Sequence, residues 1–170
     1  PGLGRRLLKH KKWLYSFAAT REVIALTAVV DVGYSSNCFC VVADLKEKKL
    51  LLDESVLGLA GPMVEVSDAP GPGLHARFTS PTLRVNASRP VGAERVSLHA
   101  SAGLLGRGLD WRVSLLAAGA PPPLTVIAPV PDDGVVNVTQ KWAGLLSFGS
   151  LRAGGRRFLL DGGVGGYDYT

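Results

Sequence analysis

The sequence predicts an all-β protein, an antiparallel barrel or a strongly curved meander with little helix. Short apolar runs, rich in β-branched and aromatic residues, recur at nearly even spacing along the 170 residues. The 21 glycines and 11 prolines are spread between these runs, where they favour turns. No segment has the periodicity of an amphipathic helix. The pattern predicts about ten or eleven strands, and closing them into a barrel removes exposed strand edges.

The clearest strand pattern lies near the N-terminus. Three apolar runs, Val23–Val32, Asn37–Leu45 and Lys49–Asp53, are separated by the turn residues Gly33–Ser36 and by the charged segment Lys46–Lys48. Runs this short, bounded by turn residues, are typical of an antiparallel meander. We therefore expect this meander to form the first part of the sheet.

A further strand precedes the meander, because Trp13, Tyr15 and Phe17 recur with a period of two. This alternation predicts a strand with one aromatic face. Cys38 and Cys40 likewise share one face of their strand, at or beyond the reach of an undistorted disulfide. We interpret them as packed thiols, and the lack of a disulfide framework favours a reducing, cytoplasmic location.

The rest of the chain begins with a stretch rich in glycine and proline, from Ser55 to Gly73, with room for one short strand at Met63–Val66. The glycine run from Gly162 to Gly166 lacks the GxGxxG phosphate-binding pattern, and we interpret it as a flexible connection. Between these stretches, strands are expected at Leu74–Thr79, Leu83–Asn86, Arg95–Ser101, Leu109–Leu116, Leu124–Ala128, Val138–Phe148 and Arg156–Asp161.

The positive charge is concentrated at the N-terminus. Arg5, Arg6, Lys9, Lys11 and Lys12 account for the formal net charge of +5, and no acidic residue lies among them. We divide the chain into a basic arm, residues 1–12, and a single β domain, residues 13–170. Two interpretations of the arm stay open, a weak contact with an anionic membrane surface and a solvated leader. The domain lacks a basic stripe with interleaved aromatic residues, so nucleic acid is not an expected partner.

Several classes of function have no sequence signal. No apolar run is long enough for a membrane-spanning helix, and no secretory signal is visible, which again favours the cytoplasm. His10, His75 and His99 are dispersed and have no metal-ligand spacing. No serine lies in a GxSxG motif. We therefore expect neither a metal nor a cofactor.

Two distant parts of the chain together resemble a known family. Lys11–Tyr15 leads into a strand that ends Val29–Tyr34, and Thr139–Gly144 precedes Gly154–Leu160 and Gly165–Thr170. These segments resemble a bacterial family of unknown function that is distantly similar to the AttH and hydroxyneurosporene synthase (carotenoid hydratase) proteins. The resemblance implies a lipocalin-like (calycin) barrel. Because longer relatives often carry two such barrels side by side, it also implies that this domain is the first part of a two-barrel protein.

The resemblance directs attention to Tyr167, Asp168 and Tyr169. Carotenoid hydratases use a carboxylate to protonate an isoprenoid double bond, and Asp168 lies where the resemblance implies a comparable acid. A carboxylate between two phenols could also lose its water at the mouth of a barrel, where it could act as an acid. The alternative is a strand or turn with exposed polar side chains.

Three functions stay open at this stage. The first is a binding module for an apolar small molecule, held in a barrel cavity by Trp13, Tyr15, Lys141 and Trp142. The second is a hydratase or cyclase that acts on an isoprenoid or polyene, with Asp168 as the proton donor. The third is a structural barrel, filled by its own side chains, that docks a partner. No catalytic motif decides between them, so the sequence leaves open whether the protein is an enzyme.

Overall fold

The computed structural model describes residues 10–103, 108–130 and 135–170, and most of the predicted basic arm lies outside these ranges. In these ranges the chain forms thirteen strands and no helix. The strands are β1 (Lys12–Ala19), β2 (Val23–Asp31), β3 (Ser35–Asp44), β4 (Lys49–Leu59), β5 (Val64–Val66), β6 (Leu74–Thr79), β7 (Leu83–Arg89), β8 (Arg95–Ala102), β9 (Leu109–Leu116), β10 (Leu124–Val130), β11 (Val135–Ala153), β12 (Arg156–Leu159) and β13 (Gly163–Tyr169).

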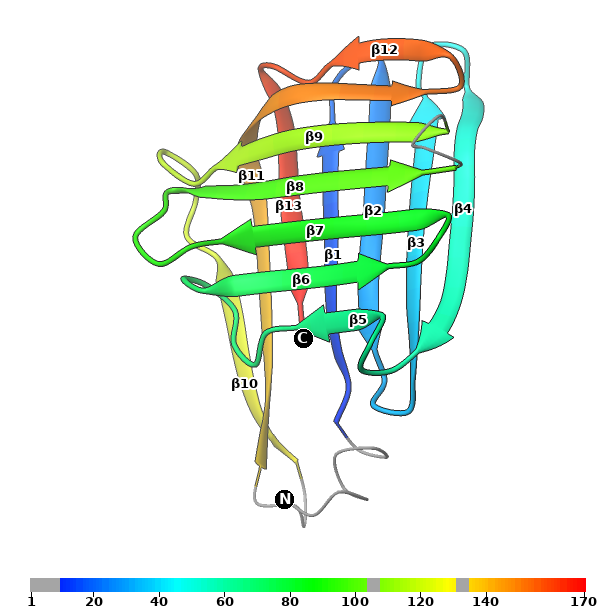
Figure 1. Cartoon of the computed structure of the whole chain (residues 1–170). Helices are drawn as coiled ribbons and strands as arrows, with labels where there is room; N and C mark the ends of the chain where they lie inside the picture. Colours follow the sequence, from blue (N-terminus) through cyan, green and yellow to red (C-terminus); the bar gives the residue numbers. More distant parts are fainter. Residues whose placement is uncertain (1–9, 104–107, 131–134) are drawn as a thin grey trace.

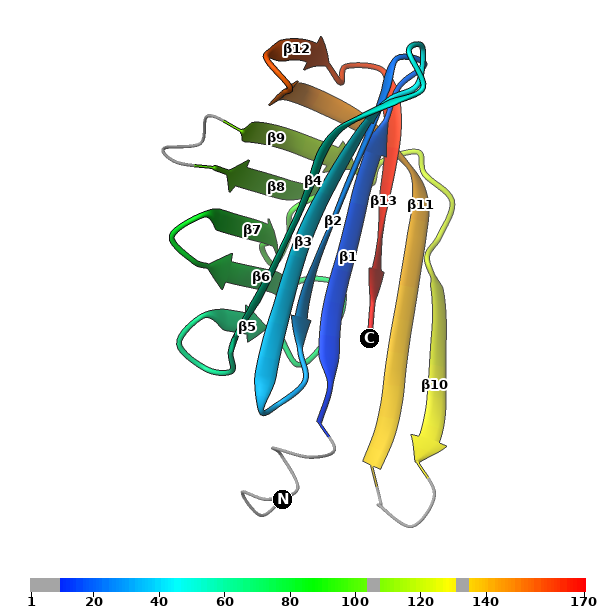
Figure 2. The same ribbon diagram turned by 90° about the vertical axis from the view of Figure 1, so that its right-hand side faces the viewer.

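All of these strands belong to one antiparallel sheet, in the order β4-β3-β2-β1-β13-β11-β9-β8-β7-β6-β5, with β10 and β12 also paired to β11. The sheet folds into two layers (Figures 1 and 2). The first layer contains β1 to β4, β13, β10 and the first half of β11. The second layer contains β5 to β9, β12 and the second half of β11, and its strands run across those of the first. The result is a nearly closed, flattened barrel, which confirms the predicted all-β fold.

The long strand β11 belongs to both layers. Its first half pairs with β10 and β13, and its second half pairs with β9 and β12. Between the halves, Gly144 has a φ of 79° and the register to β13 shifts between Ala143 and Leu145. Further along, a Cβ on Gly149 would lie 2.1 Å from the carbonyl oxygen of Arg112 on β9. Glycine at these two points lets the strand bend from one layer into the other, as in orthogonal sheet packing.

The glycine-rich segment is β13, which lies between β1 and β11 near the middle of the sheet. A Cβ on Gly165 would lie 2.7 Å from the carbonyl oxygen of Phe17, and one on Gly166 would lie 2.3 Å from that of Trp142. The prediction of a flexible connection here is therefore wrong. Gly163–Tyr169 is a fully paired strand, and glycine stands where the neighbouring backbones leave no room for a side chain.

Most of the other predicted strands lie where the sequence places them. The predicted segments Leu74–Thr79 and Leu109–Leu116 coincide with β6 and β9. The largest differences are in β4, which continues to Leu59 inside the predicted loop region, and in β11, which has 19 residues instead of Val138–Phe148. Both strands are longer because neighbours pair with them along their whole length: β3 with β4, and β10 and β12 with the two ends of β11.

Side chains fill the space between the two layers. The largest buried residues include Trp111, Phe78, Leu83 and Leu145, each with 0% of its surface exposed, and they pack in one cluster. A cavity large enough for water would leave its lining accessible, so the core around these residues is filled. An apolar ligand would have to displace core side chains to enter it.

The two cysteines lie in this core. Cys38 and Cys40 are both buried and free, and they share one face of β3 as predicted. The Cys40 thiol donates to the Thr27 hydroxyl oxygen at 3.2 Å. Burial raises the pKa of Cys40 to about 11, so this thiol stays protonated and packs as an apolar group.

Candidate functional site

The candidate residues from the sequence divide between the two faces of the first layer. Successive side chains of a strand point to opposite faces. Tyr167 and Tyr169 are therefore buried inside the barrel, while Asp168 between them lies on its outer face. The inner group consists of Trp142, Tyr167 and Tyr169, and the outer group consists of Trp13, Tyr15, Lys141 and Asp168.

The inner group is built around Trp142 and Tyr167, which are cross-strand partners on β11 and β13. Their ring centroids lie 6.1 Å apart with an interplanar angle of 73°, an edge-to-face contact. The Arg89 guanidinium lies 4.9 Å from the centre of the Trp142 ring, within cation–π range. The Tyr167 hydroxyl donates to the Gln140 side-chain oxygen at 2.6 Å, and the Trp142 indole N–H donates to the Pro121 carbonyl oxygen at 2.6 Å. Burial raises the pKa of Tyr167, and the charge of Arg89 offsets part of that rise.

Tyr169 and Lys12 connect the first layer to the segment that follows β5. The Tyr169 hydroxyl donates to the Ser67 carbonyl oxygen at 2.8 Å. The Lys12 ammonium donates to the Val66 carbonyl oxygen at 2.5 Å and pairs with Asp68 at 3.0 Å. Burial raises the pKa of Tyr169 to about 12, and the charge of Asp68 adds to the rise. Lys12, assigned to the basic arm in the sequence, is thus the first residue of β1.

The inner group holds the fold together and offers no free polar group to a ligand. Each of its hydroxyl and indole N–H groups has a partner in the protein. Sequence reasoning missed Gln140 and Arg89, which complete the group. Gln140 had a signal, because it lies two residues before Trp142 on the same strand and so shares its face. No sequence pattern indicates Arg89, since it comes from β7 in the other layer.

The outer group centres on the ion pair between Asp168 and Lys141, which are cross-strand partners on β13 and β11. The Lys141 ammonium donates to Oδ2 of Asp168, and the two side chains are 56% and 27% exposed. Oδ1 of Asp168 is buried, and no described residue donates a hydrogen bond to it. Tyr15 is the partner of Asp168 on β1, and burial raises its pKa. A buried carboxylate oxygen without a donor is costly.

Aromatic and aliphatic side chains surround this ion pair. The register places Tyr15, Ala28 and Phe39 in one row across β1, β2 and β3. On the edge strand β4, Leu57 and Leu59 are 79% and 69% exposed. In the described ranges no other strand lies over this side of the first layer (Figure 2). We call it the outer aromatic face, and it contains Trp13, Tyr15, Phe17, Leu26, Val30, Phe39 and Val41.

The sequence profile of a family described as Domain of unknown function (DUF2804) matches residues 2–170. The chain belongs to this family. A search of curated proteins finds no match. A crystal structure named AttH, from Nitrosomonas europaea, has the same fold, with a TM-score of 0.54 and 9% sequence identity over 94% of this chain.

The AttH comparison shows the fold alone, because the sequence identity is only 9%. This chain therefore shares its fold with that structure, which confirms the lipocalin-like barrel that the sequence predicted. The match covers 51% of the AttH chain, so the DUF2804 chain spans about half the length of that relative.

The described part of the chain contains no helix with the length and hydropathy that a membrane span requires. In the same ranges, no three His, Cys, Asp or Glu side chains gather as ligands for one metal ion.

The raised pKa of Tyr169 predicts a loss of stability at alkaline pH. The phenol loses its proton near pH 10 in the unfolded chain and near pH 12 in the folded chain. Its contribution to stability is therefore fully present below pH 10 and is lost as the pH rises through 12. We expect Tyr169→Phe to flatten the fall in the free energy of unfolding between pH 10 and 12, measured by urea denaturation. At pH 7 the lost hydrogen bond to Ser67 should cost about 1 kcal/mol.

Tyr34→Phe is the matched control, because Tyr34 is 61% exposed in the turn between β2 and β3. This variant should keep the wild-type pH profile. An unchanged slope in Tyr169→Phe would show that the phenol is not protected by the fold.

Proposed function

We propose that this DUF2804 domain is an interaction module, a filled lipocalin-like barrel whose outer aromatic face packs against a second β-barrel. The proposal rests on the outer aromatic face, where aromatic rings lie on the outside of the barrel rather than in its core. The side chains of this face are half-buried and adjoin one another. Contiguous apolar surface patches are typical of interfaces, and aromatic residues are enriched there. The packing of the core supports the same conclusion, since side chains fill the space around Trp111 and Phe78.

A second β-barrel is the partner that the length of the chain and the resemblance to AttH-like proteins favour. Longer relatives in the AttH-like group often carry two barrels side by side, and this chain spans 51% of the AttH structure. Two copies of this chain together would reach the length of that relative. For the chain by itself, a second copy is therefore a partner of suitable size and surface.

The pair between Asp168 and Lys141 would fix the register of this interface. An exposed ion pair contributes at most about 1 kcal/mol, because water competes for both charges. Under a second barrel the same pair would be cut off from water, and Oδ1 of Asp168 would then need a donor from the partner. A partner that places a donor there is favoured over one that does not, which gives the contact specificity.

The same surface would also bind an apolar small molecule. The rings of Trp13 and Tyr15 and the aliphatic stem of Lys141 would form one wall of a cleft between the two barrels. A lipid or polyene would then be held between barrels rather than inside one, which accommodates both a filled core and an apolar ligand.

We expect the chain to form a dimer in sedimentation velocity at about 100 µM protein. Phe39→Glu, which puts a charge in the middle of the outer aromatic face, should make it monomeric because the charge would lose its water in the interface. Thr79→Glu is the matched control, since Thr79 is exposed on β6 in the second layer, and it should leave the dimer intact. A monomeric wild-type chain, or a dimer that Phe39→Glu does not change, would contradict the proposal.

A second candidate function is enzymatic. In it, Asp168 donates a proton to a double bond of an isoprenoid or polyene, as the resemblance to carotenoid hydratases implies. Water would then add to the carbocation and return one proton to the carboxylate. The unpaired Oδ1 on an apolar face favours this candidate, because protonation of carbon needs a positioned acid shielded from water. The pair with Lys141 would have to open for Asp168 to hold a proton. Tyr167 and Tyr169 point to the opposite face, so they would position β13 rather than contact the substrate.

Asp168→Asn separates this candidate from docking alone. In a reaction with a polyene, followed by mass spectrometry of the products, the variant should no longer add water. Asp53→Asn, an exposed residue of β4 on the same face, is the matched control and should keep wild-type turnover. Equal turnover in Asp168→Asn and wild type would exclude Asp168 as the proton donor, and a wild-type chain without turnover would exclude the enzymatic candidate while leaving the docking proposal intact.

A further inference from the structure

The outer face of the second layer differs in chemistry from the outer aromatic face. Its outward side chains are mostly polar, and basic residues exceed acidic ones. Guanidinium groups bind carboxylate and phosphate groups well because their N–H groups match two oxygens at once. The outward charged residues of this layer are Arg77, Arg84, Arg95, Arg112, Arg152 and Arg157, with Glu65 and Asp110.

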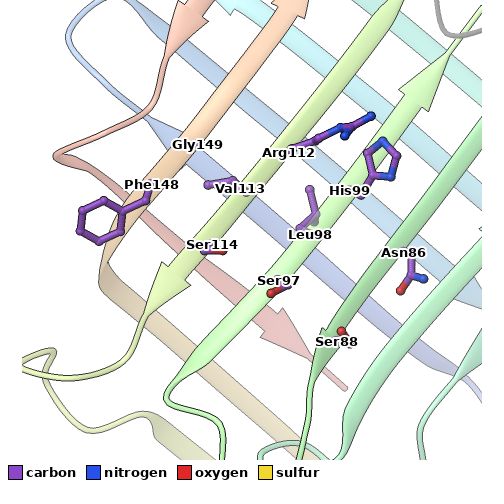
Figure 3. Close-up of a pocket in the computed structure, with 10 residues that line it drawn as sticks. All are labelled: Asn86, Ser88, Ser97, Leu98, His99, Arg112, Val113, Ser114, Phe148 and Gly149. Atoms are coloured by element: carbon purple, nitrogen blue, oxygen red, sulfur yellow. The ribbon is translucent and has the colours of Figure 1, made fainter.

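A shallow groove of about 480 Å³ crosses this face over β7, β8, β9 and β11 (Figure 3). The register explains its shape, because Ser88, Ser97 and Ser114 are successive cross-strand partners. Their small side chains form a floor of three hydroxyl groups. Phe148 is the partner of Ser114 on β11 and contributes an aromatic ring at that end of the groove.

The adjacent row of larger side chains forms one wall of the groove. It consists of Asn86, His99 and Arg112, which are also cross-strand partners. The Arg112 Nε donates to Oδ1 of Asp110 at 3.1 Å, and the His99 Nε2 lies 3.4 Å from the same oxygen. Arg152 reaches Oδ2 of Asp110 at 3.4 Å. Asp110 thus holds the wall in place from the row behind it.

The single negative charge of Asp110 does not balance the positive charges of Arg112 and Arg152. Burial raises the pKa of Asp110, but the hydrogen bond and charge of Arg112, followed by Arg152 and His99, outweigh it and lower the pKa overall. Asp110 is therefore ionised at neutral pH, and it faces two arginines that stay charged. Its hydrogen bond occupies only the Nε of Arg112. Within the described ranges, neither terminal nitrogen of that guanidinium donates a hydrogen bond, so both can bind an anion in the groove.

We propose that this groove binds an anionic carbohydrate, a sugar that carries a carboxylate or a phosphate group. Arg112 would hold the anion, and the serine floor with Asn86 and His99 would exchange hydrogen bonds with the sugar hydroxyls. The Phe148 ring would pack against the apolar face of the sugar ring. The groove volume lies in the range of about 300–1,000 Å³ that is usual for small-ligand sites.

A nucleic acid fits this face less well. Binding of single strands relies on several aromatic rings that stack on successive bases, and Phe148 is the one aromatic residue among those that line the groove. The groove also lies on the opposite side of the molecule from the outer aromatic face, so a dimer formed there would leave it open. The two proposals are therefore independent and can fail separately.

The test is an NMR titration of the ¹⁵N-labelled chain with glucuronate, with glucose 6-phosphate and with neutral glucose. We expect the amide shifts to be confined to the strands around Ser97 and Arg112, with a Kd of about 1 mM for an anionic sugar. Glucose should bind at least about tenfold more weakly because it lacks the anion. Binding of one anion but not the other supports the proposal and identifies the charged group. Added salt should weaken binding, since the contact is partly electrostatic.

Substitutions of groove residues test whether the sugar binds in the groove. Arg112→Gln should lower the affinity for the anionic sugar at least about tenfold, and Ser97→Leu should abolish the shifts because it fills the floor. Arg21→Gln removes an exposed arginine in the turn between β1 and β2 and should bind as the wild type does. The ¹⁵N spectrum of each variant reports whether it is folded. Any one of five results would overturn the proposal. Three concern the sugars: equal affinity for glucose, shifts outside the groove, or no binding of either anion. The other two are unchanged binding by Arg112→Gln and displacement of the sugar by a tighter-binding single-stranded oligonucleotide.

Discussion

The close approach of β13 to its two neighbours holds the two parts of the sheet together. On one side β13 pairs with β1, which continues into the meander β2 to β4, and on the other it pairs with β11, which leads to the second layer. A Cβ on Gly163, Gly165 or Gly166 would lie 2.4, 2.7 or 2.3 Å from a carbonyl oxygen of β1 or β11. Any side chain at these positions would push the strands apart. The hydrogen-bonded continuity of the barrel therefore depends on glycine in this one strand.

Two consequences for function follow from this closure. The layers come close enough for their side chains to fill the core, with Trp111 and Phe78 fully buried. The second consequence is that the sheet has two outer faces. The first layer presents aromatic rings around the pair between Asp168 and Lys141, whereas the second layer presents arginine, histidine and serine around a shallow groove. One sheet thus offers two outer faces of different chemistry.

Much of this fold could be predicted from the sequence, because most strands have a strong local alternation of apolar and polar residues. The strand β13 could not, since glycine has no side chain to show burial, and the reason for glycine lies in Phe17 and Trp142, far away in the chain. The candidate site was predicted as a list of residues but not as a geometry. A period of two places Asp168 and its flanking tyrosines on opposite faces, but only the fold shows which face is the core. The serines of the groove have no signal in the sequence, because only the register between three strands brings them into a row.

The central claim is that apolar ligands meet this protein on its outer aromatic face and not in its core. The most direct measurement is a titration of the chain, labelled with ¹³C in the leucine and valine methyl groups, with the isoprenoid alcohol farnesol. We expect shifts at Leu26, Val30 and Val41 on the outer face, with the core methyls of Val85 and Leu83 unchanged. Shifts at Val85 and Leu83 with an unchanged outer face would show that the barrel opens to hold the ligand inside, and would contradict the claim.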